Sequence, residues 1–124
     1  MNSKYKGSLA VSQCITKLYE LGHEVLLPIG DRMVYDLVFD DGNQLQKVQV
    51  KYAGKYKSNK HVAGLRTTGG NQSYNYAKKY SDDSFDFLYV YTEDKQHYLI
   101  KWSDVQARNS IVLEDIKYQK YKLV

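Results

Sequence analysis

Residues Tyr35–Lys51 read YDLVFDDGNQLQKVQVK, and this pattern predicts two short strands joined by a turn. The first strand, Tyr35–Phe39, is apolar apart from one aspartate. Asp41-Gly42-Asn43 favours a tight turn, because Gly and Asn tolerate the positive φ that a hairpin needs. The second strand then alternates with period two, so its polar residues share one face and its valines the other: Lys47, Gln49 and Lys51 against Val48 and Val50.

Three polar side chains of this hairpin have a chemistry that goes beyond a strand surface. The Asp36 carboxylate is a hard oxygen ligand suited to Mg²⁺, and Gln49 offers a neutral amide oxygen beside the Val50 carbonyl. The Lys51 ammonium could stabilise negative charge developing on a phosphate or help to deprotonate a metal-bound water. These are the parts of a metal-dependent phosphodiesterase site. The alternative is a set of ordinary surface residues, since such a spacing is common by chance.

The whole chain has the size and composition of one soluble domain. It has 124 residues, of which 43% are hydrophobic and 26% charged, so we expect a single domain over residues 1–124. The longest uncharged apolar run, Val25–Ile29, is far below the ~20 residues of a membrane span, and no export leader opens the chain. The single Cys14 fits a reducing compartment. We therefore expect a cytoplasmic protein that makes no membrane contact.

Basic residues are concentrated in one part of the sequence. Residues 42–81 hold eight Lys and Arg residues and no Asp or Glu, on a chain whose formal charge is +4. A polyanion such as DNA would neutralise them, so we expect residues 52–80 to be a basic DNA-binding insertion; a solvated, flexible loop is the alternative. Arginine suits guanine edges, lysines suit phosphates, and amides can read adenine. The candidate DNA contacts are Arg32, Lys55, Lys57, Lys60, Arg66, Gln72, Asn75, Lys78 and Lys79.

The other elements follow from periodicity and turn residues. A helix is expected over residues 2–22, capped by Ser3 or Ser8, with an apolar stripe that includes Val11. Strands are expected over 23–29, 85–91 and 97–102, turns at Ser58-Asn59 and Gly69-Gly70, and short helices over 74–80 and from an N-cap at Ser103. The middle strand is nearly all apolar, which predicts burial on both faces. The tail 111–124 could be a strand, a helix or an oligomer contact. The fold class is α/β (α+β), a central mixed sheet with a helix against it.

Taken in order, several of these stretches resemble the PD-(D/E)XK nuclease superfamily, and within it the small group I intron-encoded homing endonucleases of cyanobacteria. The stretches are Lys6-Gly7, residues 21–25, Pro28, residues 35–38 and residues 49–51. The resemblance covers residues 4–53 well and 86–102 more loosely. It implies a restriction-endonuclease-like core, a central mixed β-sheet flanked by helices.

The same resemblance implies roles for the hairpin residues. Asp36 would be the metal-binding acid, Lys51 the catalytic lysine and the Val50 carbonyl part of the metal shell, while Gln49 stands where most members have Glu or Asp. The implied cofactor is Mg²⁺, for which Mn²⁺ could substitute. The implied activity is site-specific cleavage of double-stranded DNA, of the intron-homing type, by a homodimer or homotetramer associated with the nucleoid when bound.

Two positions depart from the family pattern. Gln49 brings no charge, and Val11 stands where related sequences read KG-x-x-x-E. Glu20 cannot replace that missing acid, because it lies roughly 180° around the helix from Val11; Glu24 remains an alternative, as does a purely structural role for Val11. We expect a catalytically impaired nuclease. The rival interpretations are a junction-resolving nuclease of the same fold and a non-catalytic DNA-binding module.

Overall fold

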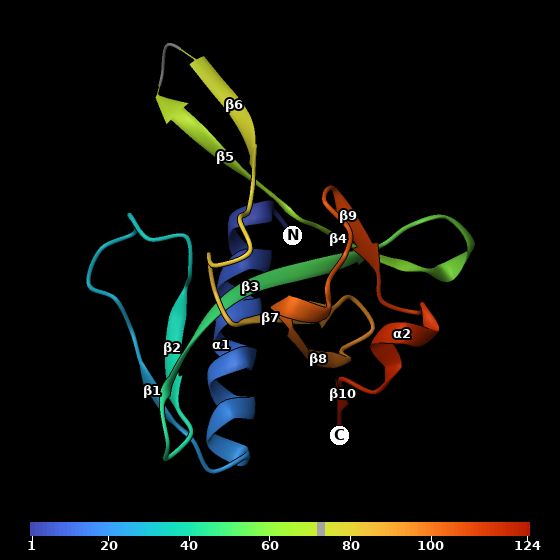
Figure 1. Cartoon of the computed structure of the whole chain (residues 1–124). Helices are drawn as coiled ribbons and strands as arrows, with labels where there is room; N and C mark the ends of the chain where they lie inside the picture. Colours follow the sequence, from blue (N-terminus) through green and yellow to red (C-terminus); the bar gives the residue numbers. More distant parts are fainter. Residues whose placement is uncertain (72–73) are drawn as a thin grey trace.

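The fold is a mixed sheet with one long helix against it and a two-stranded hairpin standing off it (Figure 1). The computed structural model describes residues 1–71 and 74–124, and it describes side chains outside residues 67–79. The helices are α1 (Ser3–Glu20) and α2 (Ile116–Gln119), with 3-10 turns at Lys57–Asn59 and Trp102–Asp104. The strands are β1 (Glu24–Leu26), β2 (Leu37–Asp40), β3 (Leu45–Lys55), β4 (His61–Gly64), β5 (Arg66–Asn71), β6 (Tyr74–Lys79), β7 (Phe87–Thr92), β8 (His97–Lys101), β9 (Ser110–Val112) and β10 (Lys122–Leu123).

Strand β3 pairs with three other strands of the sheet, β2, β7 and β4. The strand order is β1-β2-β3-β7-β8-β10, and the far end of β3 also pairs with β4, which in turn pairs with β9. The β2–β3 and β7–β8 pairs are antiparallel, whereas β3 and β7 run parallel. The sheet is therefore mixed, which confirms the predicted fold class, although the helices are few. No described helix is long and apolar enough to cross a membrane.

Each face of the sheet has its own hydrophobic core. On one face, Ala10, Cys14 and Leu18 of α1 pack against side chains of β2, β3 and β7, including Val48 and Val50. On the other face, β7 and β8 pack against Trp102 and the segments around β9 and α2. Strand β7 is thus buried on both faces, as its apolar run predicted.

Helix α1 begins and ends at recognisable signals. The Asn2 side chain accepts a hydrogen bond of 2.9 Å from the Tyr5 N–H, so the N-cap is Asn2 and not the predicted Ser3 or Ser8. The chain leaves the helix at Gly22, whose φ of +89° is accessible to glycine. The predicted stripe faces the sheet: Leu9, Val11 and Ile15 are partly buried against the core that the helix covers.

Three further local predictions were wrong. Residues 74–79 form strand β6 and not a helix, because they pair with β5. Gly69 and Gly70 lie inside β5, opposite Tyr76 and Asn75, so they are not a turn. Ser103 lies within a 3-10 turn that has no side-chain cap. The turn at Ser58-Asn59 is confirmed, with positive φ at both residues.

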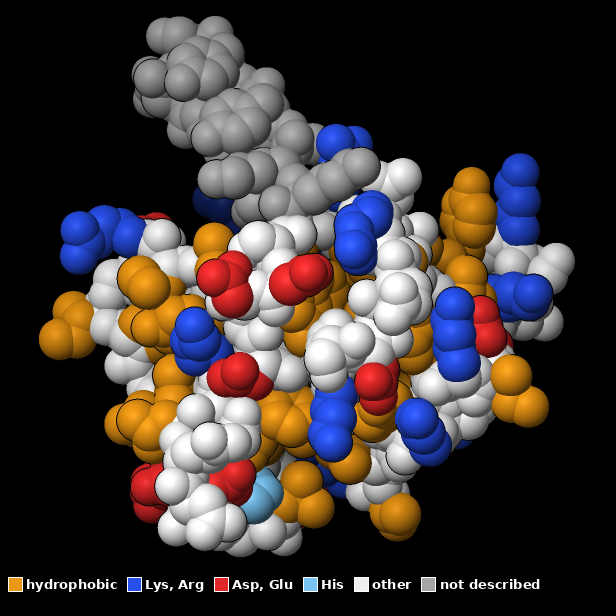
Figure 2. Space-filling model, in the orientation of Figure 1, with side chains coloured by type: hydrophobic (Ala, Val, Ile, Leu, Met, Phe, Trp, Pro, Cys, Tyr) orange, Lys and Arg blue, Asp and Glu red, His pale blue; other side chains and the backbone are white. Residues whose placement is uncertain are grey.

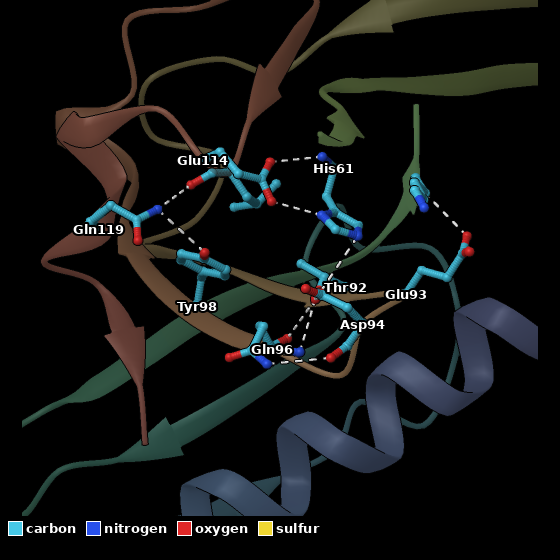
Figure 3. A network of polar contacts seen from close by, with 10 residues as sticks. His61, Thr92, Glu93, Asp94, Gln96, Tyr98, Glu114 and Gln119 are labelled. Atoms are coloured by element: carbon cyan, nitrogen blue, oxygen red, sulfur yellow. Dashed lines mark hydrogen bonds and ion pairs between the residues drawn. The ribbon is translucent and has the colours of Figure 1, made fainter. Parts of the chain in front are cut away.

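A polar network ties β4 to the segments that follow β7 and β9 (Figure 3). The buried His61 ring lies between two carboxylates, with Nδ1 2.7 Å from Glu114 and Nε2 3.5 Å from Asp94. Glu114 also accepts the His61 backbone N–H at 2.7 Å. Burial raises the pKa of the Glu114 carboxyl, but the hydrogen bonds from His61 outweigh burial, so the net pKa is lowered. This network fixes the far end of β3 through its partner β4.

Candidate active site

Asp36 lies immediately before β2 and holds β3 at two points. Pairing between the two strands ends at Leu37 and Val48. Beyond it, the Asp36 N–H donates to the Val48 carbonyl at 2.8 Å, and a carboxylate oxygen of Asp36 accepts the Val50 N–H at 2.7 Å. The side chain thus takes over the role of a backbone acceptor, which fixes the position of the carboxylate at the edge where β2 leaves β3.

Gln49 and Val50 lie directly beside this carboxylate. Gln49 is buried, contrary to the solvent position that a strand's polar face normally takes. Its amide nitrogen lies 3.5 Å from the Val50 carbonyl oxygen, at the outer limit of a hydrogen bond. The amide thus turns its nitrogen toward this carbonyl, and it would have to rotate and present its oxygen for the two groups to hold one cation.

The N-terminal half of α1 forms the opposite wall of an open cleft of about 590 Å³. Val11 lines this cleft together with Asp36, Gln49 and Val50. The fold thus places Val11 and Asp36, which the resemblance predicted to lie in one site, in the same cleft. The helix wall also includes Lys4, Gly7, Ser8, Ser12 and Ile15.

The acid of the cleft is the half-buried Asp36. Burial raises the pKa of Asp36, while the Val50 N–H and the Lys51 ammonium act in the opposite direction. Burial, and secondarily the charge of Asp36, raises the pKa of the Cys14 thiol behind the helix wall, which keeps that thiol neutral. The Lys51 ammonium lies over the Tyr80 ring, 5.2 Å from its centroid. The half-buried Asp36 carboxylate thus has the Lys51 ammonium near enough to act on its pKa, and Lys4 of α1 adds a second positive group to the lining of the cleft.

The donor atoms fit a hard divalent cation. Asp36, the Gln49 amide and the Val50 carbonyl supply only oxygen ligands, which Mg²⁺ prefers, and the open cleft leaves room for water. In the part of the chain with described side chains, no three His, Cys, Asp or Glu residues converge on one point. The set therefore carries a single negative charge, because the positions of Gln49 and Val11 are uncharged.

The candidate DNA contacts are spread over three places. Lys55, Lys57 and Lys60 are exposed at the β3–β4 turn, where basic side chains gather at the right edge of Figure 2. Arg66 is exposed at the start of β5, and Arg32 is exposed on the β1–β2 connection.

The expected insertion 52–80 is divided by the fold. Residues 52–55 and 61–64 belong to the central sheet, and only the β5–β6 hairpin stands apart from it (Figure 1). Gln72 lies outside the described residues, as do the side chains of Asn75, Lys78 and Lys79.

Sequence reasoning placed Val11 in the site but did not find the rest of the helix wall or Tyr80. Lys4, Ser8, Val11 and Ile15 recur at helical spacing, so the helix wall could have been found from polar residues on an otherwise apolar stripe. Tyr80, whose ring lies under Lys51, gave no sequence signal, because the contact joins residues that only the fold brings together.

The class of protein follows from the comparison with family models. The chain belongs to the PD-(D/E)XK endonuclease family, whose model matches residues 1–122. Among solved structures, it is similar to the bacterial homing endonuclease I-Ssp6803I, with 32% sequence identity and a TM-score of 0.82, over 98% of this chain and 89% of that one. No curated protein matches the chain. The family and fold predicted from the sequence are thereby confirmed, and the protein is a nuclease by family.

Proposed function

We propose that this protein is a Mg²⁺-dependent endodeoxyribonuclease that hydrolyses phosphodiester bonds at a specific site in double-stranded DNA. The observation that supports this most directly is the convergence of Asp36, Gln49 and Val50 in one open cleft beside Lys51. The similarity to a bacterial homing endonuclease supports an intron-homing role.

The residues of the cleft divide the chemistry between them. Asp36, the Gln49 amide oxygen and the Val50 carbonyl would hold Mg²⁺, which would polarise the phosphate and activate a water. The Val50 N–H fixes the Asp36 carboxylate so that it need not reorient when the ion binds. Lys51 brings a positive charge next to the same carboxylate, where it can stabilise the negative charge that develops at phosphorus.

DNA would be held by the exposed basic side chains of the three regions described above. Lys55, Lys57 and Lys60 are suited to phosphates, and Arg66 at the base of the β5–β6 hairpin is suited to a guanine edge. Gln72, Asn75, Lys78 and Lys79 of the hairpin, and Arg32, complete the proposed contacts.

Val11 makes this chain a weak catalyst in our proposal. It occupies the helix wall opposite Asp36, where the family pattern has Glu, so the ion would be held by one carboxylate instead of two or three. The same observation favours a second candidate function, a DNA-binding module that retains the fold and does not cleave.

Exposed apolar side chains support self-association into a homodimer or homotetramer. Leu27, Ile29 and Met33 are all more than half exposed on the β1–β2 connection, and apolar side chains lie at the left edge of the face in Figure 2. A palindromic duplex needs one active site per strand, which a twofold dimer supplies. Light scattering with and without duplex DNA tests this; a monomer under both conditions contradicts it.

The decisive experiment for the function is nicking of supercoiled plasmid with Mg²⁺ or Mn²⁺. Three proteins are compared: the chain itself, Val11→Glu, and Val11→Glu combined with Lys51→Ala. We expect Val11→Glu to cut at least 100-fold faster than the chain itself, a typical effect of restoring one electrostatic group, and the double variant to be inactive. If none cuts a plasmid that carries an intron insertion site while all bind duplex DNA, the binding module is the correct function.

A further inference from the structure

The ammonium of Lys51 is held by an aromatic ring from a distant part of the chain. Its Nζ lies 5.2 Å from the centroid of the Tyr80 ring, within the ~6 Å over which a cation is attracted to a ring face. Lys51 lies on β3, whereas Tyr80 directly follows β6. The contact restricts a flexible four-carbon side chain whose ammonium is near enough to Asp36 to act on the pKa of that carboxyl.

The Tyr80 ring is itself fixed by the core. It meets Phe85 and Trp102 edge to face, at centroid distances of 5.1 and 6.1 Å. Phe85 and Trp102 are buried and lie 4.6 Å apart. The Trp102 indole N–H donates to the Ser81 carbonyl at 2.9 Å, so the backbone next to Tyr80 is anchored to the same pair. The ring under the ammonium therefore has a defined position.

The β5–β6 hairpin joins the body at this place. Arg66 and Lys79 form the last pair of its ladder, and Leu65 and Tyr80 are the residues through which its two strands enter the body (Figure 1). Leu65 is buried, and its N–H donates to the Asn109 carbonyl at 2.8 Å. The second strand enters at Tyr80, directly beside the candidate active site.

We propose that Tyr80 is a positioning residue for Lys51: its ring, locked against Phe85 and Trp102, holds the ammonium where the reaction needs it. This inference rests on the proposed nuclease function and adds to it a residue outside the family motif. The alternative is that Tyr80 only fills the core, in which case removing the ring leaves the position of the Lys51 ammonium unchanged.

The contact is tested without any cleavage, by NMR of the protein with its lysines ¹³C-dimethylated, which preserves their charge. Methyl groups over a ring face resonate upfield, and Lys51→Arg identifies the Lys51 signal. We expect an upfield Lys51 signal in the chain itself and in Tyr80→Phe, and its loss in Tyr80→Leu. Tyr121→Leu is the matched control, because Lys120 lies 5.3 Å from the Tyr121 ring; it should move the Lys120 signal alone. An upfield Lys51 signal that survives in Tyr80→Leu overturns the proposal.

The role in the reaction is tested by kinetics in a chain that cuts, which is Val11→Glu if the chain itself does not. Tyr80→Leu should lower kcat roughly 10- to 100-fold without weakening DNA binding, because a displaced group costs about this much, and Tyr80→Phe should restore it. Melting curves confirm that each variant is folded at the assay temperature. An unchanged kcat in folded Tyr80→Leu overturns the positioning role. If no variant cuts DNA, the proposed function and the kinetic role fail together, whereas the NMR result still decides whether Tyr80 holds the ammonium.

Discussion

Replacing Asp36 by Asn should stabilise the protein and remove its response to divalent metal. Burial raises the pKa of this carboxyl, and the Val50 N–H and Lys51 offset only part of that. Because the pKa is higher in the folded state than in the unfolded state, the folded protein binds the proton more tightly. Any stabilisation from this group is therefore complete below the unfolded-state pKa and is lost as the pH rises through the folded-state pKa. At pH 7 the ionised group destabilises the fold.

The size of the effect follows from opposing contributions. Removing a charged group completely from water costs several kcal/mol, and Asp36 is half-buried, so its ionised form costs about 2–3 kcal/mol. Against this, an Asn oxygen can keep the 2.7 Å bond from the Val50 N–H but loses its charge assistance, about 1 kcal/mol. The attraction of Lys51 is worth less than ~1 kcal/mol. The net gain is about 1 kcal/mol, or about 4 °C in Tm for a chain of this size.

Thermal melting at pH 7 in EDTA and then in Mg²⁺ measures both parts of the prediction. In EDTA, Asp36→Asn should melt higher than the chain itself. Mg²⁺ at ten times its Kd should stabilise the chain by about 1.4 kcal/mol and leave Asp36→Asn unchanged. Asp86→Asn is the control, because Asp86 accepts the Lys47 N–H at 2.8 Å in similar geometry but is exposed; it should show no gain. A lower Tm for Asp36→Asn in EDTA would refute the reasoning, since the partners of the carboxylate would then outweigh its burial.

Other substitutions test the rest of the account. Lys51→Ala in a cleaving background should reduce the nicking rate at least 100-fold while gel-shift affinity for duplex DNA stays nearly constant; a parallel loss of affinity would assign Lys51 to binding instead. Replacing Lys57 and Lys60 by Ala should reduce the slope of log Kd against log salt by about 1.8, and an unchanged slope would place DNA elsewhere. Glu114→Ala should cost about 2 kcal/mol and about 8 °C in Tm, because two 2.7 Å bonds to His61 are lost from a partly exposed carboxylate. Since the Glu114 pKa is lowered in the fold, that difference should be present above the ordinary carboxyl pKa and vanish as the pH falls through the folded-state value; a difference independent of pH would contradict it.

The local parts of the site could be predicted because they lie on one hairpin. The turn at residues 41–43 and the alternation of residues 47–51 were sufficient to place Asp36 beside Gln49 and Val50, since strands joined by a short turn must pair. Val11 was placed in the same site by the resemblance and by the helical stripe, and the cleft contains it. The periodicity of short stretches of sequence was therefore enough to predict which of these residues lie on one face.

The parts that failed depend on tertiary pairing. Residues 74–79 include Ala and two lysines, which favour helix, but Tyr74 and Tyr76 alternate with period two and the partner strand decides the outcome. Gly69 and Gly70 look like a turn, yet they lie inside the ladder. The long basic stretch was read as one insertion, whereas β3 and β4 carry part of it back into the sheet. A sequence pattern within a short stretch does not show which of these residues pair with a partner strand.

The parallel pairing of β3 with β7 has a consequence for the order in which the protein assembles. The β2–β3 hairpin can close by itself within microseconds and already carries Asp36, Gln49 and Lys51. Val50 of β3 pairs with Tyr89 of β7, so this pairing brings together residues that are separated by the whole segment between the two strands. Such non-local contacts slow folding to milliseconds or longer. On the ribosome, the β2–β3 hairpin therefore emerges well before Tyr80 and β7, and in a nascent chain Lys51 has no Tyr80 ring beside it until that part of the chain has been synthesised.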